Sequence, residues 1–382
     1  MSSARNNRTN KRKTPFLFAF SFRFVLVIAA LAMVMSYLSV YINPVKSSIP
    51  LFFGLYFIPI VTVNFLLFLI ALLHRSGSAW IPVIVLLPGL LYAETFFKVG
   101  STPKAEKEGI KLKIESYNVG MFAAGKVMDS RLDGNKISRN KARGICRDSV
   151  MAHLRSNAPH IACFQEFYVE NKRQIDTILD KEYQYRYYHL FKIKNGHYFG
   201  NLILSKFPIT GSGKISFPKS TNLSIYTDIN HYGKTVRVYN NHLESYNISF
   251  TGLIKKFNSN ISHRDSIGNE IIEVHEKMRG TFIKRTEQAG KILETINESH
   301  LPTIICGDFN DTPMSYTYHL LSKGRKDSFK EAGSWFAGTY VPVWPLLRID
   351  YILFPENCEG VCHTTHKIEY SDHYPISAEI II

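Results

Sequence analysis

Cysteine is scarce in this 382-residue sequence: it contains five, and none stands with histidine at the spacing of a zinc site. The odd total leaves at least one thiol free. Cys163 and Cys306 lie in apolar runs typical of buried strands, where cysteine acts as a plain core residue. Cys358 and Cys362 lie four residues apart in a loop-like stretch and could pair. The cysteines therefore give no indication of a zinc site.

Acidic residues are almost missing from the first 98 residues, where Glu94 stands against nine lysines and arginines, or +8. The remainder holds 37 basic and 30 acidic residues, or +7, so more than half of the net charge of +15 belongs to the amino-terminal quarter. The rest of the chain is only mildly basic. This argues against a strong nucleic-acid footprint, which needs a basic patch.

The same amino-terminal quarter contains three long apolar stretches, at about residues 24–42, 49–73 and 79–97. Each has about 19 residues or more, close to the ~20 that cross a bilayer as a helix. Pro59, Pro82 and Pro88 lie inside them, as transmembrane helices tolerate. Three buried helices of a soluble domain are the alternative, but the connections are short and nearly uncharged. We therefore expect residues 1–98 to form a membrane anchor with three transmembrane helices.

The basic residues also predict the orientation of this anchor. Five lysines and arginines lie within the first 13 residues, ahead of the first stretch, whereas the loop after it contains only Lys46. The amino terminus is therefore expected in the cytoplasm, and an odd number of spans places the rest outside it. The lysines between Lys98 and Lys113 argue weakly against this, but a long domain can cross regardless of charge.

Residues 99–109 are polar and are interpreted as a linker, and residues 110–382 alternate short apolar strands with helical patterns. The clearest strand, residues 303–306, leads into Gly307, Asp308 and Asn310. In an extended segment Asp308 and Asn310 point to the same side. Taken alone, this could be ordinary turn chemistry. Similar polar groups, however, stand at other predicted strand ends. The full set is Asn118, Glu166, His242, Asp308, Asn310, Asp350, Asp372 and His373.

Four members of this set are carboxylates, which repel one another unless a cation or a proton is present. Oxygen ligands without cysteine favour hard cations, Mg²⁺ or otherwise Mn²⁺. An aspartate beside a histidine can orient the imidazole and stabilise its cationic form. These parts suit the in-line attack of water on phosphorus.

Six motifs carry a resemblance to a known family. They are Ser116-Tyr117-Asn118, Gln165-Glu166, Asn240-Asn241-His242-Leu243, Gly307-Asp308-Phe309-Asn310, Arg348-Ile349-Asp350-Tyr351 and Ser371-Asp372-His373-Tyr374-Pro375. In these motifs and their order, residues 110–382 resemble the endonuclease/exonuclease/phosphatase superfamily of deoxyribonucleases, apurinic/apyrimidinic endonucleases and neutral sphingomyelinases. The resemblance implies an α/β (α+β) fold: a four-layer sandwich of two mainly antiparallel β-sheets flanked by helices, here preceded by the three transmembrane helices.

The resemblance also implies which residues bind the metal. Glu166 would be the principal ligand, with Asp372 and Asn118 nearby. The cofactor would be Mg²⁺, with Mn²⁺ as a substitute.

The catalytic roles are implied in the same way. Asp308 would align or deprotonate the attacking water, and Asn310 would bind the phosphate. His242 and His373 would stabilise the pentacoordinate phosphorus, and Asp350 would orient His373. The leaving oxygen would take its proton from His242 or from a tyrosine, and the resemblance does not choose between them.

The leading functional hypothesis is a membrane-anchored phosphodiesterase with nuclease-like activity. A phospholipid hydrolase of the sphingomyelinase kind and a phosphomonoester hydrolase are alternatives, and a catalytically inactive binding module on a membrane stalk is a third. The expected partners are a phosphate-ester substrate, nucleic acid or phospholipid, and the lipid bilayer; no protein partner is predicted. The aromatic stretch 334–345 could contact a bilayer or a base, or pack in the core, and the polar stretch 245–266 could select substrates.

Overall fold

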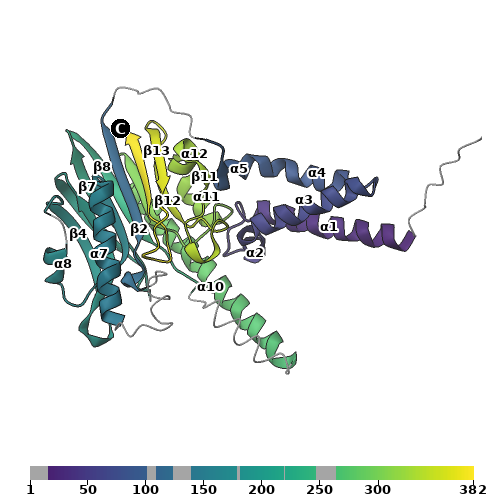
Figure 1. Ribbon diagram of the computed structural model, residues 1–382, viewed down its shortest axis with the longest axis horizontal. Coiled ribbons are helices and arrows are strands. Elements are labelled where there is room, and N and C mark those ends of the chain that lie inside the picture. The colour runs from purple at the N-terminus through teal and green to yellow at the C-terminus, as the bar shows by residue number, and fades with distance from the viewer. Residues whose placement is uncertain (1–15, 101–108, 124–138, 179–180, 219, 247–263) are drawn as a thin grey trace, which may run out of the picture.

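The computed structural model describes residues 16–100, 109–123, 139–178, 181–218, 220–246 and 264–382. Its main part contains two six-stranded sheets packed face to face (Figure 1). The first has the order β13-β14-β2-β3-β5-β4, and the second β10-β12-β9-β8-β7-β6. Only β2–β3 and β8–β9 are parallel pairs, and the other strand pairs of these two sheets are antiparallel.

The strands of the first sheet are β2 (Lys111–Asn118), β3 (Ile161–Val169), β4 (Tyr185–Lys192), β5 (Tyr198–Ser205), β13 (Glu359–Thr365) and β14 (Ile376–Ile381). Those of the second are β6 (Ile209–Ser216), β7 (Leu223–His231), β8 (Lys234–His242), β9 (Thr303–Asp308), β10 (Arg325–Asp327) and β12 (Asp350–Pro355). The helices around them are α7 (Arg139–Asn157), α8 (Gln174–Ile178), α10 (Arg264–Asn297), α11 (Tyr316–Ser322) and α12 (Ser328–Ala332). Single turns of 3-10 helix occur at Gly120–Phe122, Lys194–Gly196 and Val341–Val343.

Three apolar clusters account for the layers. Alternate residues of the strands, such as Ile114, Val238 and Ile304, fill the space between the two sheets. On the outer face of the first sheet the cluster includes Val150 of α7, and on the outer face of the second it includes Ile292 of α10. The order is thus helix, sheet, sheet, helix, which confirms the predicted sandwich of two mainly antiparallel sheets flanked by helices.

Several local expectations were wrong. Glu166 does not end β3, because the strand continues to Val169 past a register shift between Phe164 and Phe167. Only part of the stretch around the last two cysteines is a loop: Cys358 lies in the turn after β12, whereas Cys362 lies in β13, and no disulfide joins the two. Cys163 and Cys306 are buried core residues, as expected. Most of the linker 99–109 and of the stretch 245–266 lies outside the described residues.

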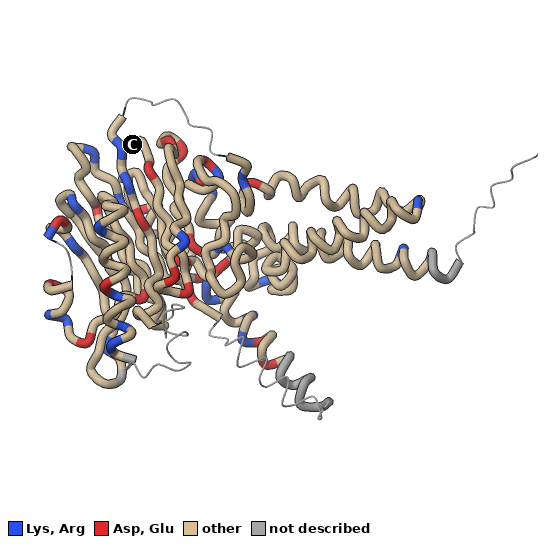
Figure 2. Tube along the Cα trace, viewed as in Figure 1, with Lys and Arg blue, Asp and Glu red and all other residues tan. Residues whose placement is uncertain are grey.

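The amino-terminal helices form a separate group beside the sandwich (Figure 1). They are α1 (Phe16–Leu38), α2 (Ile49–Leu55), α3 (Phe57–Leu73), α4 (Trp80–Leu86), the 3-10 turn η1 (Leu87–Gly89) and α5 (Leu90–Phe96). Lysine, arginine, aspartate and glutamate are nearly absent along them (Figure 2). Many of their large apolar side chains are exposed, Leu31 by 59% and Leu91 by 80%.

The prediction of three transmembrane helices was wrong as a count. Among the described residues, one helix is long and apolar enough to cross a membrane, at Phe20–Leu38. The second stretch breaks at Tyr56 into α2 and α3, which meet at 73° and together pass the same test only as a bent pair. The third, Trp80–Phe96, is shorter and contains the 3-10 turn at Leu87–Gly89, where Pro88 interrupts regular helix. The described residues therefore contain one helix that could span a membrane, or two such segments if α2 and α3 together form a single bent span.

The helices contact the sandwich directly. β1 (Phe97–Lys98), which follows α5, pairs with β11 (Trp335–Phe336). The Phe97 and Phe336 ring centroids are 5.1 Å apart. The hydroxyl of Ser39 at the end of α1 donates a 2.6 Å hydrogen bond to the carbonyl of Met314. The first residues of the aromatic stretch 334–345 thus connect the sandwich to the apolar helices through the pairing of β11 with β1.

Candidate active site

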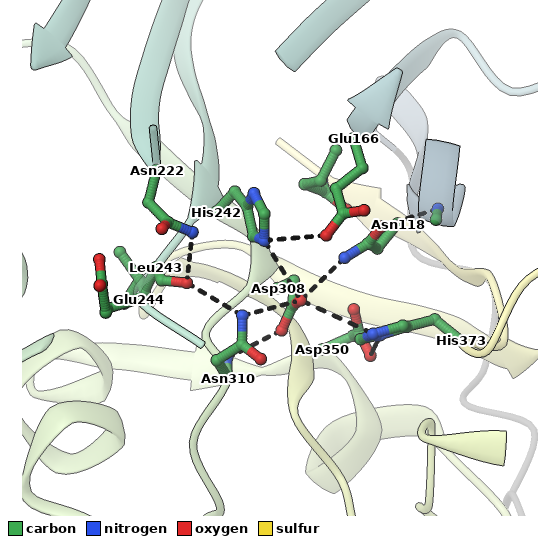
Figure 3. A network of polar contacts seen from close by, with 12 residues as sticks. Asn118, Glu166, Asn222, His242, Leu243, Glu244, Asp308, Asn310, Asp350 and His373 are labelled. Carbon is green, nitrogen blue, oxygen red and sulfur yellow. Dashed lines mark hydrogen bonds and ion pairs between the residues drawn. The ribbon is translucent and has the colours of Figure 1, made fainter. Parts of the chain in front are cut away.

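The predicted site residues other than Asp372 lie close together in Figure 3. Asp372 adjoins them, since its charge affects the pKa of Glu166 and of His373. His242 and Asp308 are opposite partners at the ends of parallel strands β8 and β9. Asp350, at the start of β12, is paired with Asp308 because β12 runs antiparallel to β9. Asn118 ends β2 and is paired with Gln165 of β3. The sheet pairings thus place the ends of both sheets around Asp308.

Asp308 is the centre of this network and is 1% exposed. Its Oδ2 accepts hydrogen bonds from Asn118 Nδ2 at 2.9 Å and Asn310 Nδ2 at 3.1 Å, and its Oδ1 accepts one from the Asn310 backbone N–H at 2.8 Å. His242 Nε2 and His373 Nε2 lie 3.9 and 3.8 Å from the same Oδ2. Burial raises the pKa of Asp308 to about 6, with Asp350 adding to the increase and the histidines opposing it. The carboxyl is thus poised to exchange a proton near neutral pH.

The backbone at Gly307 explains how this carboxylate reaches the site. Gly307 has φ +131°, and a Cβ there would lie 2.0 Å from the carbonyl oxygen of Asn241 on the neighbouring strand. Only glycine permits this close approach of β8 to β9. Three residues on, Asn310 has φ +52°, and its side chain also donates to the carbonyl of Leu243 at 2.9 Å. The turn after β9 is therefore built to aim Asp308 and Asn310 together.

Glu166 reaches the site from a β-bulge. It has φ +53° and lies where the pairing of β3 with β5 shifts register. Bulges re-aim a side chain without ending the strand. Glu166 Oε1 lies 3.5 Å from His242 Nε2. Burial lowers the pKa of His242, so at neutral pH this is a contact between a carboxylate and a neutral ring.

His373 and Asp350 form the predicted pair, with His373 Nδ1 3.0 Å from Asp350 Oδ2. Burial alone would lower the pKa of His373, but the carboxylates of Asp350 and Asp308 outweigh it and raise the pKa well above its ordinary value. The imidazole is therefore cationic at neutral pH, which is the form that can stabilise phosphoryl oxygens.

The donor set at the site fits a divalent cation. The pKa of Glu166 is raised, first by burial and then by the charge of Asp372, and a cation between the two would relieve that repulsion. With Asn118 these groups form the oxygen-rich set that Mg²⁺ prefers. Donor atoms of Asp308, Asp350 and His373 also lie within 4.8 Å of one another, but His373 is already bonded to Asp350. Glu166, Asp372 and Asn118 therefore stay the predicted ligands.

Other residues at the site were not predicted. Asn222 Nδ2 donates to the carbonyl of Leu243 at 2.9 Å, the acceptor that Asn310 also uses. The Thr339 hydroxyl accepts from the backbone N–H of Asp350 at 3.2 Å, and the Tyr340 ring packs edge-on against His373 with centroids 5.4 Å apart. Burial raises the pKa of Tyr340 to about 12, so its hydroxyl stays protonated. Their only sequence signal was that the last two lie in the aromatic stretch.

Comparisons with known proteins bear on the family and on the fold. Residues 116–373 match the Endonuclease/Exonuclease/phosphatase family, and residues 18–96 match a domain of unknown function. An endonuclease/exonuclease/phosphatase from Beutenbergia cavernae is 15% identical, with a TM-score of 0.51 over 71% of this chain and 72% of that one. A family protein from Bacteroides thetaiotaomicron is 17% identical, with a TM-score of 0.50 over 72% and 99%. A mannosyl-6-phosphatase from the same species is 17% identical, with a TM-score of 0.49 over 71% and 100%. No curated protein matches the sequence.

Proposed function

This chain belongs to the endonuclease/exonuclease/phosphatase family of phosphoester hydrolases, and on that premise we propose that it is a membrane-anchored, divalent-metal-dependent phosphodiesterase with nuclease-like activity. The observation that carries the proposal is the convergence of Glu166, His242, Asp308 and the Asp350–His373 pair at one end of the sandwich. In this proposal residues 1–98 are the anchor, 99–109 the linker and 110–382 the catalytic domain.

The residues divide the reaction among them. Mg²⁺ or Mn²⁺, held by Glu166, Asp372 and Asn118, would supply positive charge for the phosphoryl oxygens. Asp308 orients a water molecule and takes its proton as the water oxygen bonds to phosphorus and the bond from phosphorus to the leaving oxygen breaks.

The phosphoryl group is held by the remaining side chains. Cationic His373 donates a hydrogen bond to its oxygens, and Asp350 keeps the ring of His373 in place. The side-chain N–H groups of Asn310 donate to Leu243 and Asp308 in the structure, and one of them would turn to the phosphoryl group when the substrate binds. The leaving oxygen takes its proton from Tyr340, or from the protonated form of His242, which the lowered pKa of His242 makes a minor species at neutral pH. The variants His242→Gln and Tyr340→Phe separate the two, because a substrate with a leaving group that needs no proton rescues only the variant that lacks the acid.

The membrane is the second part of the proposal. The exposed apolar side chains of α1, α3 and α5 need an apolar surrounding, and a bilayer provides one. The basic residues before α1 favour a cytoplasmic amino terminus, and an odd number of crossings would then place the sandwich outside. Protease added to intact cells should degrade residues 110–382; their protection would show that the domain faces the cytoplasm.

One observation favours phospholipid as a second candidate substrate. The sandwich does not hang on a long free tether, because β1 pairs with β11 and Ser39 bonds to Met314. These contacts would hold the site at a fixed distance from the bilayer. The surface of the bilayer is where lipid phosphates are concentrated. A phosphodiesterase in this position would reach head groups without a further binding domain.

A substrate panel tests the proposal on the full-length protein in detergent. Plasmid DNA, sphingomyelin in mixed micelles, bis-p-nitrophenyl phosphate and p-nitrophenyl phosphate are each incubated with Mg²⁺, with Mn²⁺ and with EDTA. We expect metal-dependent hydrolysis of at least one diester, abolished by Asp308→Asn and retained by the exposed control Asp148→Asn. Hydrolysis of the monoester alone would show that the protein is a phosphatase and not a diesterase. Activity that survives EDTA or Asp308→Asn would refute the proposed site, and no hydrolysis at all would favour a binding module.

A further inference from the structure

A second group of metal-ligand side chains lies away from the candidate active site, between α7 and the outer face of the first sheet. It consists of Glu115 on β2, His153 on α7 and His366 after β13, with one donor atom of each within 4.8 Å of the others. Ile114 belongs to the core between the sheets, so Glu115 points to the opposite face, toward α7. It precedes Asn118 by three residues, or about 10 Å along the strand, so the two sites are distinct.

Glu115 is poorly satisfied for a buried carboxylate. It is 1% exposed; its Oε2 accepts a hydrogen bond from Asn157 Nδ2, and its Oε1 has no hydrogen-bond partner among the described residues. His153 Nε2 is likewise buried without a hydrogen bond in that part of the chain, although it lies 3.4 Å from Glu115 Oε2. Such atoms are rare in folded proteins, because burying them costs free energy unless something binds them.

His366 completes the group from the other side. Its Nε2 lies 2.8 Å from the hydroxyl of Ser377, which is the residue paired with Glu115 on the neighbouring strand β14. The His366 and His153 rings meet nearly edge to face, with centroids 4.8 Å apart. A histidine that bonds an oxygen through one ring nitrogen has its tautomer and orientation fixed for binding a metal through the other.

We propose that Glu115, His153 and His366 bind a transition-metal ion, Zn²⁺ in the first place, which fastens α7 to the first sheet. Two imidazole nitrogens and one carboxylate oxygen suit Zn²⁺, with water as the fourth ligand. Mg²⁺ does not suit this set, because it prefers oxygen ligands. The chain would then hold two different metals, one at the phosphoester site and one in the fold. Sequence spacing does not reveal the second, because its ligands come from residues 115, 153 and 366.

Metal content and thermal unfolding test this proposal without reference to activity. The full-length protein in detergent is stripped with EDTA, given ZnCl₂ in excess Mg²⁺, desalted and analysed for bound zinc. We expect about one zinc that is lost in His153→Gln and His366→Gln and retained in Glu166→Gln and in the histidine control His189→Gln. Zinc at a free concentration 100-fold above its Kd should raise the midpoint of wild type and Glu166→Gln by about 5 to 10 °C and leave the two histidine variants unchanged.

Co²⁺ gives a second measurement on the same proteins. Bound by two imidazoles and a carboxylate near tetrahedral geometry, it should produce visible d–d absorption in wild type and Glu166→Gln and none in His366→Gln. A wild-type protein that retains no zinc and shows no midpoint shift would overturn the proposal, even if neither histidine variant folds. So would zinc binding that is lost in Glu166→Gln and kept in His366→Gln, because the ion would then belong to the active site.

Discussion

The buried guanidinium of Arg348 offers a sharp test of how the sandwich is held together. Arg348 is 1% exposed, and its Nη2 donates a 2.5 Å hydrogen bond to Asp327 Oδ1. Its Nη1 donates to the carbonyl of Thr95 in α5 at 3.3 Å, and its guanidinium lies over the rings of Phe329 and Tyr351. One side chain thus connects α12, β12 and the last amino-terminal helix.

Arg348→Met keeps most of the apolar length of the side chain but leaves Asp327 buried beside no cation. Asp327 keeps two hydrogen bonds, from the Tyr318 hydroxyl at 2.7 Å and the Phe329 N–H at 2.9 Å, and these do not neutralise its charge. Breaking a buried pair in this way costs about 3 to 5 kcal/mol. At roughly 2 to 4 °C per kcal/mol for a domain of this size, the midpoint of thermal unfolding should fall by about 10 °C.

The assay compares wild type, Arg348→Met, Asp327→Asn and the double variant in one detergent, with unfolding followed by near-UV circular dichroism. The double variant should be more stable than the sum of the single effects predicts, because the neutral amide needs no partner charge, and a coupling of about 2 kcal/mol is expected. Arg147→Met is the control, since its partner Asp148 is exposed and such pairs contribute under about 1 kcal/mol. The reasoning fails if the unfolding midpoint of Arg348→Met is lowered no more than that of Arg147→Met. It also fails if the effects of Arg348→Met and Asp327→Asn simply add in the double variant.

Three further changes follow from particular contacts. Asp350→Asn removes the charge that holds His373, so kcat on any diester cleaved by the wild type should fall about 10²- to 10³-fold while Asp148→Asn stays unchanged; an equal kcat would remove Asp350 from the site. Gly307→Ala places a Cβ 2.0 Å from a carbonyl oxygen and should lower the free energy of unfolding, measured by denaturant titration, by about 3 kcal/mol or more. Gly324→Ala is the control, because Gly324 also has positive φ but lies in open space, and its loss should be smaller. Similar losses in the two variants would contradict the steric argument. Burial first, and then Arg348, lowers the pKa of His363 from 6.5 to about 3. Below pH 6.5 the unfolded chain therefore binds a proton at this histidine that the folded chain does not bind. The free energy of unfolding should then decrease by up to about 1.4 kcal/mol per pH unit as the pH falls, and it should decrease less steeply in His363→Gln. Identical slopes in the two proteins would exclude His363 as the cause.

Local patterns predicted the sandwich well wherever one face of a strand is buried. The alternation before Asn118 and the apolar run before Gly307 gave β2 and β9 because burial on one or both faces leaves a clear period. β6 shows no such clear period, since Gly211 and Gly213 dilute its pattern at the edge of the sheet. α12 has only five residues, which are too few to show a helical period in the sequence.

The remaining errors concern features that no local pattern contains. The bulge at Glu166 exists only as a shift against β5, so composition could not separate it from a strand end. The break at Tyr56 in the second apolar stretch also gives no signal in the sequence, because the residues on both sides are apolar. At the site, Thr339 acts through its hydroxyl on the backbone of Asp350, a contact between residues that are eleven positions apart in the sequence.

The position of each site residue relative to its strand does contain information about the direction of that strand. Asn118, Glu166, His242 and Asp308 come at or near the ends of strands in the two parallel pairs, β2–β3 and β8–β9. Asp350 stands at the start of β12, and Asp372 and His373 precede β14; these two strands run antiparallel to β9 and β2. For all seven side chains to meet at one end, strands that end in a site residue must run one way and strands that begin with one must run the other. The requirement that the polar groups share one site thus fixes the directions of six strands before any pairing is known.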